Sequence, residues 1–96
     1  MKRIWKFCIK GIGDQIEDQI EIGMPEGAEI LCVQSQCERA AFIWAIVDDN
    51  MVYERRRFAV YGTGQEMDAI TVERYIGTFQ LYGGKLVFHL FEVPYK

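Results

Sequence analysis

Apolar and polar residues alternate along most of this chain, and a period of two is typical of strands that bury one face. In Ile4–Lys10, the side chains of Trp5, Phe7 and Ile9 share one face, and two lysines lie on the other. Residues 19–24 repeat the pattern, with two isoleucines and a methionine on one face. Both segments are predicted to be half-buried strands.

The middle of the chain predicts two more strands. Ala28–Gln36 alternates between two partly apolar faces, one predicted to carry Ile30 with Cys32 and the other Leu31 with Val33. Ala40–Val47 is apolar on both faces and rich in Phe, Ile and Trp, which favours a strand over a helix at this length. Ala40–Val47 is therefore predicted to be the central strand of a sheet.

The second half of the chain predicts a single strand and then a hairpin. Glu54–Tyr61 is the fifth predicted strand. Tyr75–Leu81 and Lys85–Val93 alternate clearly and are joined through Tyr82-Gly83-Gly84, and a Gly-Gly pair between alternating runs is a strong hairpin signal. Between the fifth strand and the hairpin, Gln65–Arg74 is polar and does not alternate, so we predict a loop that crosses a sheet edge, with room for one helical turn.

Seven short strands separated by turns predict an all-β fold, either a compact antiparallel sandwich or a partly open barrel. Residues 1–96 form one predicted domain, because this length leaves no room for a second. The exposed edges of so small a sheet need cover, so a homodimer that pairs or buries an edge is expected. The predicted core consists of large apolar side chains: Trp5, Phe7, Leu31, Val33, Phe42, Trp44, Phe58, Val60, Phe79, Leu86 and Phe88.

Composition and charge restrict the classes of partner. The net charge is −3, so we expect no general nucleic-acid binding. No apolar run approaches the length of a membrane span, which predicts no membrane partner, and lysines interrupt any signal-like segment near the N-terminus. Three cysteines without an export signal predict reduced thiols and a cytoplasmic protein.

Cys8, Cys32, Cys37 and the single histidine, His89, form a combination with zinc-like chemistry. The spacing between Cys32 and Cys37 lacks the tight chelating turn of cysteines separated by two residues. We therefore predict no metal and no cofactor, and we place the strand cysteines in the core as small apolar residues. His89 is predicted to be structural, because no motif connects it with Ser35, the only serine.

Gly62-Thr63-Gly64 follows a predicted strand and invites comparison with phosphate-binding loops. Those loops need a longer glycine pattern that opens a helix, and the stretch downstream here is acidic, with Glu66 and Asp68. A turn is the better interpretation. Because the sequence also shows no nucleophile–base pair, it predicts a protein that is not an enzyme.

Arg55-Arg56-Arg57 is a basic cluster within a predicted strand. Alternation places Arg55 and Arg57 on one face, where guanidinium groups about 6.5–7 Å apart are able to hold a phosphate or a carboxylate. Tyr61 and Tyr75 are candidates for stacking beside them, and these four residues form the predicted ligand-binding site. The competing interpretation is a solvated strand face whose arginines pair across a hairpin with nearby carboxylates, those of Glu54, Asp48 and Asp49.

Several segments together resemble a family of small proteins found in bacteriophages and prophages. The segments that carry the resemblance are Ile4-Trp5-Lys6-Phe7, Met24-Pro25-Glu26-Gly27-Ala28-Glu29-Ile30-Leu31, Val33-Gln34, Ile43-Trp44-Ala45, Val47-Asp48, Arg57-Phe58, Tyr61-Gly62-Thr63-Gly64, Tyr75-Ile76-Gly77-Thr78-Phe79-Gln80, Gly83-Gly84 and Val87-Phe88-His89. The resemblance spans nearly the whole chain. It implies a phage-type protein in the cytoplasm of a bacterial host, and it transfers no site residue.

The function expected from the sequence is that of a non-catalytic, homo-oligomeric binding module. The resemblance implies that the module either inhibits a host protein of anti-phage defence or sequesters a small anionic, nucleotide-like ligand. This implication is an analogy with other small phage proteins and does not rest on a site. The alternative is a structural or accessory protein of a virion or its assembly.

Overall fold

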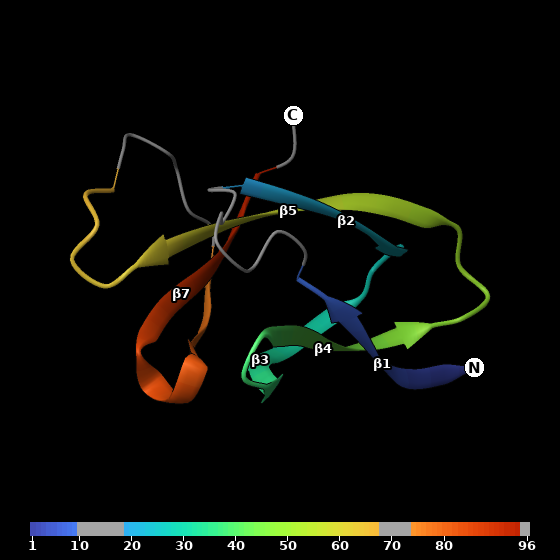
Figure 1. Ribbon diagram of the computed structural model, residues 1–96. Helices are drawn as coiled ribbons and strands as arrows, with labels where there is room; N and C mark the ends of the chain where they lie inside the picture. The colour runs from blue at the N-terminus through green and yellow to red at the C-terminus, as the bar shows by residue number, and fades with distance from the viewer. Residues whose placement is uncertain (10–18, 68–73, 95–96) are drawn as a thin grey trace.

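A computed structural model of the chain describes residues 1–9, 19–67 and 74–94. Within these ranges there are seven strands and one short 3-10 turn, η1, and no helix long and apolar enough to span a membrane (Figure 1). The elements, in chain order, are β1 Lys2–Cys8, β2 Gln19–Pro25, β3 Glu29–Cys37, β4 Ala40–Asp48, β5 Tyr53–Gly62, β6 Arg74–Leu81, η1 Tyr82–Gly84 and β7 Leu86–Val93.

The seven described strands form two antiparallel sheets. The three-stranded sheet has the order β1-β4-β3, and the four-stranded sheet has the order β2-β5-β7-β6. Figure 1 shows β2 and β5 in one layer and β1, β3 and β4 in the other. The predicted all-β fold is confirmed, and the two separate sheets make it a sandwich and not a closed barrel.

Strand β4 is the central strand of the three-stranded sheet, as its two apolar faces predict. Its odd-numbered residues from Ala41 to Val47 point into the core and are buried. Phe42, Trp44 and Ile46 lie on the opposite, outer face and are half-buried. An alternating pattern cannot show which of two apolar faces is the inner one, so the predicted burial of Phe42 and Trp44 was wrong.

The core lies between the two sheets. Its largest side chains come from both layers, with Ile30, Ile43 and Val47 from the three-stranded sheet and Phe58 and Leu90 from the four-stranded sheet. Among the predicted core residues, four are buried: Val33, Phe58, Val60 and Phe79. Four more pack against the core but are only half-buried: Trp5, Phe7, Leu86 and Phe88.

Leu31 was predicted to be buried and is instead 41% exposed. The register between β3 and β4 shifts between Ile30 and Cys32, so Leu31 is an extra residue at a bulge. The extra residue moves the alternation by one position, and Ile30 and Val33 both face the core. The predicted pairing of Leu31 with Val33 on one face was therefore wrong.

Glycines mark two of the turns. The predicted β6–β7 hairpin closes through η1, in which Gly83 and Gly84 have φ of 66° and 91°, a region that favours glycine. Gly62-Thr63-Gly64 is also a turn, closed by a bond from Gln65 N–H to the Gly62 carbonyl, which confirms the turn interpretation. In the predicted loop Gln65–Arg74, Arg74 already belongs to β6, and residues 68–73 lie outside the described residues.

The two sheets approach each other most closely where β3 meets β6. Arg74 Nη2 donates a hydrogen bond of 2.7 Å to the carbonyl of Ile30. At the other end of β6, Tyr82 N–H donates to the carbonyl of Glu38, 2.8 Å away. These bonds hold the edges of the two sheets together along one side of the sandwich.

Candidate functional site

The four predicted site residues lie on one surface, the outer face of the four-stranded sheet. Arg55, Arg57 and Tyr61 alternate in β5 with residues that point into the core. Tyr75 of β6 is opposite Phe91 of β7, which is opposite Ala59 of β5. The arginines lie at one end of β5 and the tyrosines toward the other, so the four residues share a face and do not form one cluster.

The side chain of Arg57 has no hydrogen bond or ion pair with any other described residue, although the residue is half-buried. Its cross-strand neighbour in β2 is Glu21. The Glu21 carboxylate contacts Arg55 Nη1 instead, at 3.4 Å and at an exposed position. Glu21 is thus partly neutralised by Arg55, and the charge of Arg57 is left without a counter-ion in the described chain.

Arg56 points the opposite way, as alternation predicts. Its guanidinium binds both carboxylate oxygens of Glu92, at 2.6 and 3.0 Å, and donates to the Ala28 carbonyl at 2.9 Å. Glu54 is farther away, at 3.8 Å. The arginine partners are therefore glutamates of the same sheet, and the hairpin pairing with Asp48 and Asp49 that the sequence allowed is not formed.

Asp48 and Asp49 belong to a separate ionic cluster at the start of β1. The Met1 amino group contacts both carboxylates, and Arg3 Nε lies 2.5 Å from Asp49. The Asn50 N–H and then the amino group lower the pKa of Asp48, and Arg3 lowers the pKa of Asp49. The same carboxylates raise the pKa of the amino group. These groups serve the fold and are remote from the predicted site.

Three aromatic rings meet on the outer face of the four-stranded sheet. The Phe91 ring lies between Tyr61 and Tyr75, with centroid distances of 6.0 and 5.4 Å. Tyr61 is only 4% exposed, so its ring supports Phe91 and is not itself a free stacking surface. Tyr75 is 55% exposed and is the accessible ring of this cluster.

A hydrogen-bond network centred on His89 runs across the same face. His89 Nε2 lies 2.7 Å from Thr63 Oγ1, and His89 Nδ1 lies 2.9 Å from Thr78 Oγ1. Thr78 Oγ1 is in turn 2.5 Å from the Tyr75 hydroxyl. Both ring nitrogens of His89 therefore have partners, in keeping with a structural histidine.

The sequence pattern did not predict this network, although each segment that contributes to it carries part of the sequence resemblance. Thr63 comes from the turn after β5, Thr78 from β6 and His89 from β7. They meet because β7 lies between β5 and β6, with Tyr61, His89 and Thr78 side by side in one row. The available signal was that Thr63, Thr78 and His89 all stand in segments that carry the sequence resemblance.

The four residues with zinc-like chemistry are not brought together. Cys8, Cys32 and Cys37 lie in the three-stranded sheet and are free thiols, whereas His89 lies in the other sheet. The described residues contain no group of three or more His, Cys, Asp or Glu side chains suited to a metal ion. Cys8 is exposed on the outer face and Cys32 is half-buried on the same face, so the predicted place of both in the core was wrong.

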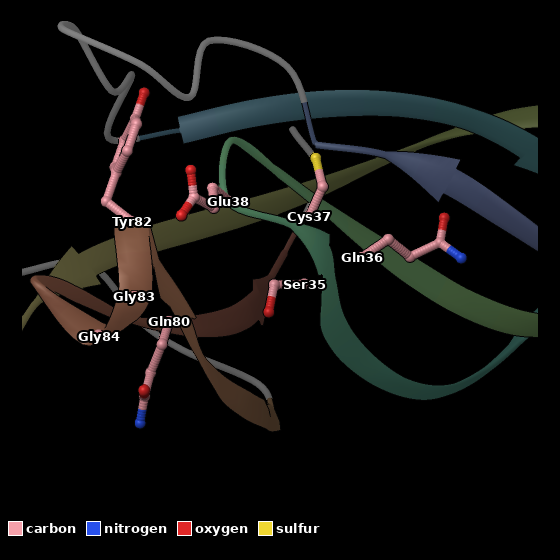
Figure 2. Close-up of a pocket in the computed structure, with 8 residues that line it drawn as sticks. All are labelled: Ser35, Gln36, Cys37, Glu38, Gln80, Tyr82, Gly83 and Gly84. Atoms are coloured by element: carbon pink, nitrogen blue, oxygen red, sulfur yellow. The ribbon is translucent and has the colours of Figure 1, made fainter.

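A shallow pocket of about 320 Å³ lies elsewhere, between the β3–β4 turn and η1. Figure 2 shows that the side chains of Gln36, Gln80 and Tyr82 around it point in different directions. Groups that bind a small ligand normally converge on it. This pocket is therefore a weaker candidate for a ligand-binding site than the outer face of the four-stranded sheet.

Comparison with protein families gives one match, which covers residues 1–96 and is described as a domain of unknown function, DUF7352. The chain belongs to this family. Comparisons with curated proteins and with solved structures found no match. Membership in DUF7352 assigns no activity, so a function for the chain has to be argued from its surfaces.

Proposed function

We propose that this chain is a non-catalytic binding module that holds a small anionic, nucleotide-like ligand on the outer face of its four-stranded sheet. The observation that carries the proposal is the state of Arg57, a half-buried residue whose guanidinium has no counter-ion among the described residues. A charge that is partly removed from water is costly unless it is paired. A ligand phosphate supplies the missing partner, and the planar guanidinium binds it through two hydrogen bonds.

The neighbouring residues fit the rest of such a ligand. Arg57 is opposite Val93, and Phe91 lies two residues from Val93 on the same face of β7. By strand rise, the row of Phe91 and Tyr75 is therefore about 7 Å from Arg57 along the sheet. A phosphate at Arg57 leaves a base or another flat ring within reach of the exposed Tyr75 ring.

The His89 network provides polar recognition beside these rings. Hydroxyl groups of Thr63 and Thr78 donate and accept hydrogen bonds, as the edges of bases and sugars require. The described partners of His89 are hydroxyl groups, whereas a histidine that acts as a general base is usually oriented by a carboxylate that stabilises the imidazolium. This arrangement supports binding in preference to catalysis.

The phage-type part of the proposal rests on the sequence resemblance. A bacteriophage or prophage protein in the bacterial cytoplasm that holds a nucleotide-like ligand would withdraw a signal from the host.

The second candidate function is direct inhibition of a host protein. The observation that favours it is the apolar outer face of the three-stranded sheet, where Ile4 is 62% exposed, because exposed apolar patches mark protein contacts.

The ligand proposal is tested by calorimetric titration with a panel of nucleoside monophosphates and cyclic dinucleotides. We expect at least one nucleotide to bind, and Arg57→Gln to weaken it by about tenfold or more, because a hydrogen bond between charged groups contributes about 1.5–3 kcal/mol. Lys85→Gln is the matched control, since it removes the same charge from an exposed position beside η1. Equal affinities for the two folded variants, or no heat with any nucleotide, would refute the proposal.

A further inference from the structure

The outer face of the three-stranded sheet is apolar at its centre and charged at two edges. Four rows lie on it: Lys2 with Asp48, Ile4 with Ile46 and Glu29, Lys6 with Trp44 and Cys32, and Cys8 with Phe42 and Gln34. The aromatic and aliphatic side chains of β4 lie in the middle. Strand β1 supplies cations on one side, and strand β3 supplies a carboxylate on the other.

Three of the four charged residues on this face have no counter-ion within the described chain, and the fourth, Asp48, pairs with the Met1 amino group. Lys2, Lys6 and Glu29 are exposed, and none of them forms an ion pair with another described residue. Lys6 Nζ lies over the rings of Phe42 and Trp44, 4.6 and 5.7 Å from their centroids, and donates to the uncharged Gln36. Lys2 and Glu29 are therefore available to a partner at the two edges, and the Lys6 ammonium lies over the rings of the central strand.

The centre of this face, around Trp44, has the composition of an interface core. Interface cores are enriched in tryptophan and other aromatic residues, and they are depleted in charge. Trp44, Phe42 and Ile46 have this composition, and they are only half-buried in the single chain.

We propose that a second copy of this chain covers this face, with a two-fold axis parallel to β4. Such an axis places β1 of each chain over β3 of its partner, and Trp44 near the axis faces its own copy. In this register, Glu29 lies opposite the row of Ile4, between Lys2 and Lys6 of the other chain. The contact is made twice by symmetry, as in an isologous dimer.

The charges select this arrangement over the other face-to-face dimer. An axis perpendicular to the strands and through the row of Trp44 would place β1 over β1, and Lys6 would then face Lys6 of the partner. Like charges that face each other in an interface are strongly unfavourable. The separation of cations on β1 from the carboxylate on β3 is what makes the face complementary to itself, and this argues for a second copy as the occupant.

The test measures the mass of the protein in solution by sedimentation over a concentration series. We expect the wild type to be a dimer, and Glu29→Lys to raise its dissociation constant by more than about tenfold, because three lysines then meet at each edge. The double variant Lys2→Glu/Lys6→Glu should be weakened in the same way. An equimolar mixture of the two variants should form a heterodimer, since each charged edge again meets its opposite.

Each result decides the proposal. A wild type that is monomeric throughout the series overturns it, and so does a dimer that Glu29→Lys leaves unchanged, which would indicate another interface. A mixture that stays monomeric while both variants keep the circular dichroism spectrum of the wild type also overturns it. The proposed nucleotide site lies on the other sheet, so nucleotide titration of the Glu29→Lys variant separates failure of the dimer from failure of the binding function.

Discussion

Gly77 of β6 lies directly against Val33 of β3, so close that a Cβ added to Gly77 would stand 2.9 Å from Val33 Cγ1. The register of β6 against β7 shifts between Tyr75 and Gly77, so the glycine follows a bulge. Side chains on opposing sheets normally keep the two backbones well apart. The missing side chain of Gly77 lets the edge strands of the two sheets meet.

Replacement of Gly77 by alanine is expected to destabilise the fold. The added methyl group overlaps Val33 Cγ1, which belongs to a stiff β-branched side chain, so Val33 or the two strands must shift. Overpacking of this kind costs about 1–3 kcal/mol, measurable as a lower midpoint of urea unfolding. Gly23→Ala in β2 is the control, because its Cβ would make an ordinary 3.6 Å contact with Tyr53. Equal midpoints for the two variants would contradict this account of the β3–β6 contact.

The ion pair of Arg56 and Glu92 is expected to stabilise the fold more than the exposed pair of Arg55 and Glu21. Their side chains are 17% and 12% exposed, so Glu92→Leu leaves a guanidinium largely removed from water without its carboxylate. We expect a loss of about 2–4 kcal/mol in the free energy of unfolding. The double variant Arg56→Met/Glu92→Leu should recover most of it, because both charges of the inner pair are then replaced by apolar side chains.

The control for this pair is Arg55 with Glu21, which has an exposed contact of 3.4 Å. Glu21→Leu should change the free energy of unfolding by less than about 1 kcal/mol. A Glu92→Leu variant that is no less stable than Glu21→Leu would show that the inner pair does not stabilise the sandwich.

The two threonines that bind His89 should behave as one unit. Thr63→Val and Thr78→Val each remove a hydrogen bond to one ring nitrogen, at an expected cost of about 0.5–1.5 kcal/mol. Because both bonds act through His89, the cost of the double variant should differ from the sum of the single costs by about 0.5 kcal/mol or more. Chemical unfolding of the four proteins checks this, and strict additivity would argue against a connected network.

The ionic cluster at β1 predicts a dependence of stability on pH. Asn50 N–H and Arg3 hold the pKa values of Asp48 and Asp49 below their usual 3.8. The stabilisation from these carboxylates is therefore fully present above that value and is lost as the pH falls through the lowered pKa values. We expect the double variant Asp48→Asn/Asp49→Asn to melt below the wild type at neutral pH and to converge with it in acid. A gap in Tm that persists unchanged in acid would contradict this assignment.

The strands and turns were readable from the sequence because their causes are local. Alternation located the described strands other than β4, and the paired glycines Gly83 and Gly84 marked the hairpin that the structure confirms. The long apolar run of β4 identified a central strand, whose side chains are flanked on both sides by those of neighbouring strands.

The bulge at Leu31 could not be predicted by the same reasoning. Ile30, Leu31, Cys32 and Val33 are all apolar, so a shift of one residue leaves no trace in the alternation. The choice between the two faces of β4 failed for the same reason. Polar residues show which positions of a strand face water, and neither segment contains any.

The candidate site was predictable only in part. Alternation placed Arg55 and Arg57 together correctly, because two residues of one strand need no knowledge of the fold. The contact of His89 with Thr63 joins residues 26 positions apart. It depends on β7 pairing with β5, and strand order is set by long-range packing that no local pattern records.

The most direct test of the proposed function is an NMR titration of the isotope-labelled wild-type protein with the nucleotide panel. It reports in one measurement whether a nucleotide binds and where. The account predicts shifts that saturate and are concentrated on Arg57, Tyr75, His89 and Phe91, with the residues of β1 and β3 unaffected. No saturable shifts, or shifts confined to the pocket beside η1 or to the three-stranded sheet, would contradict the central claim.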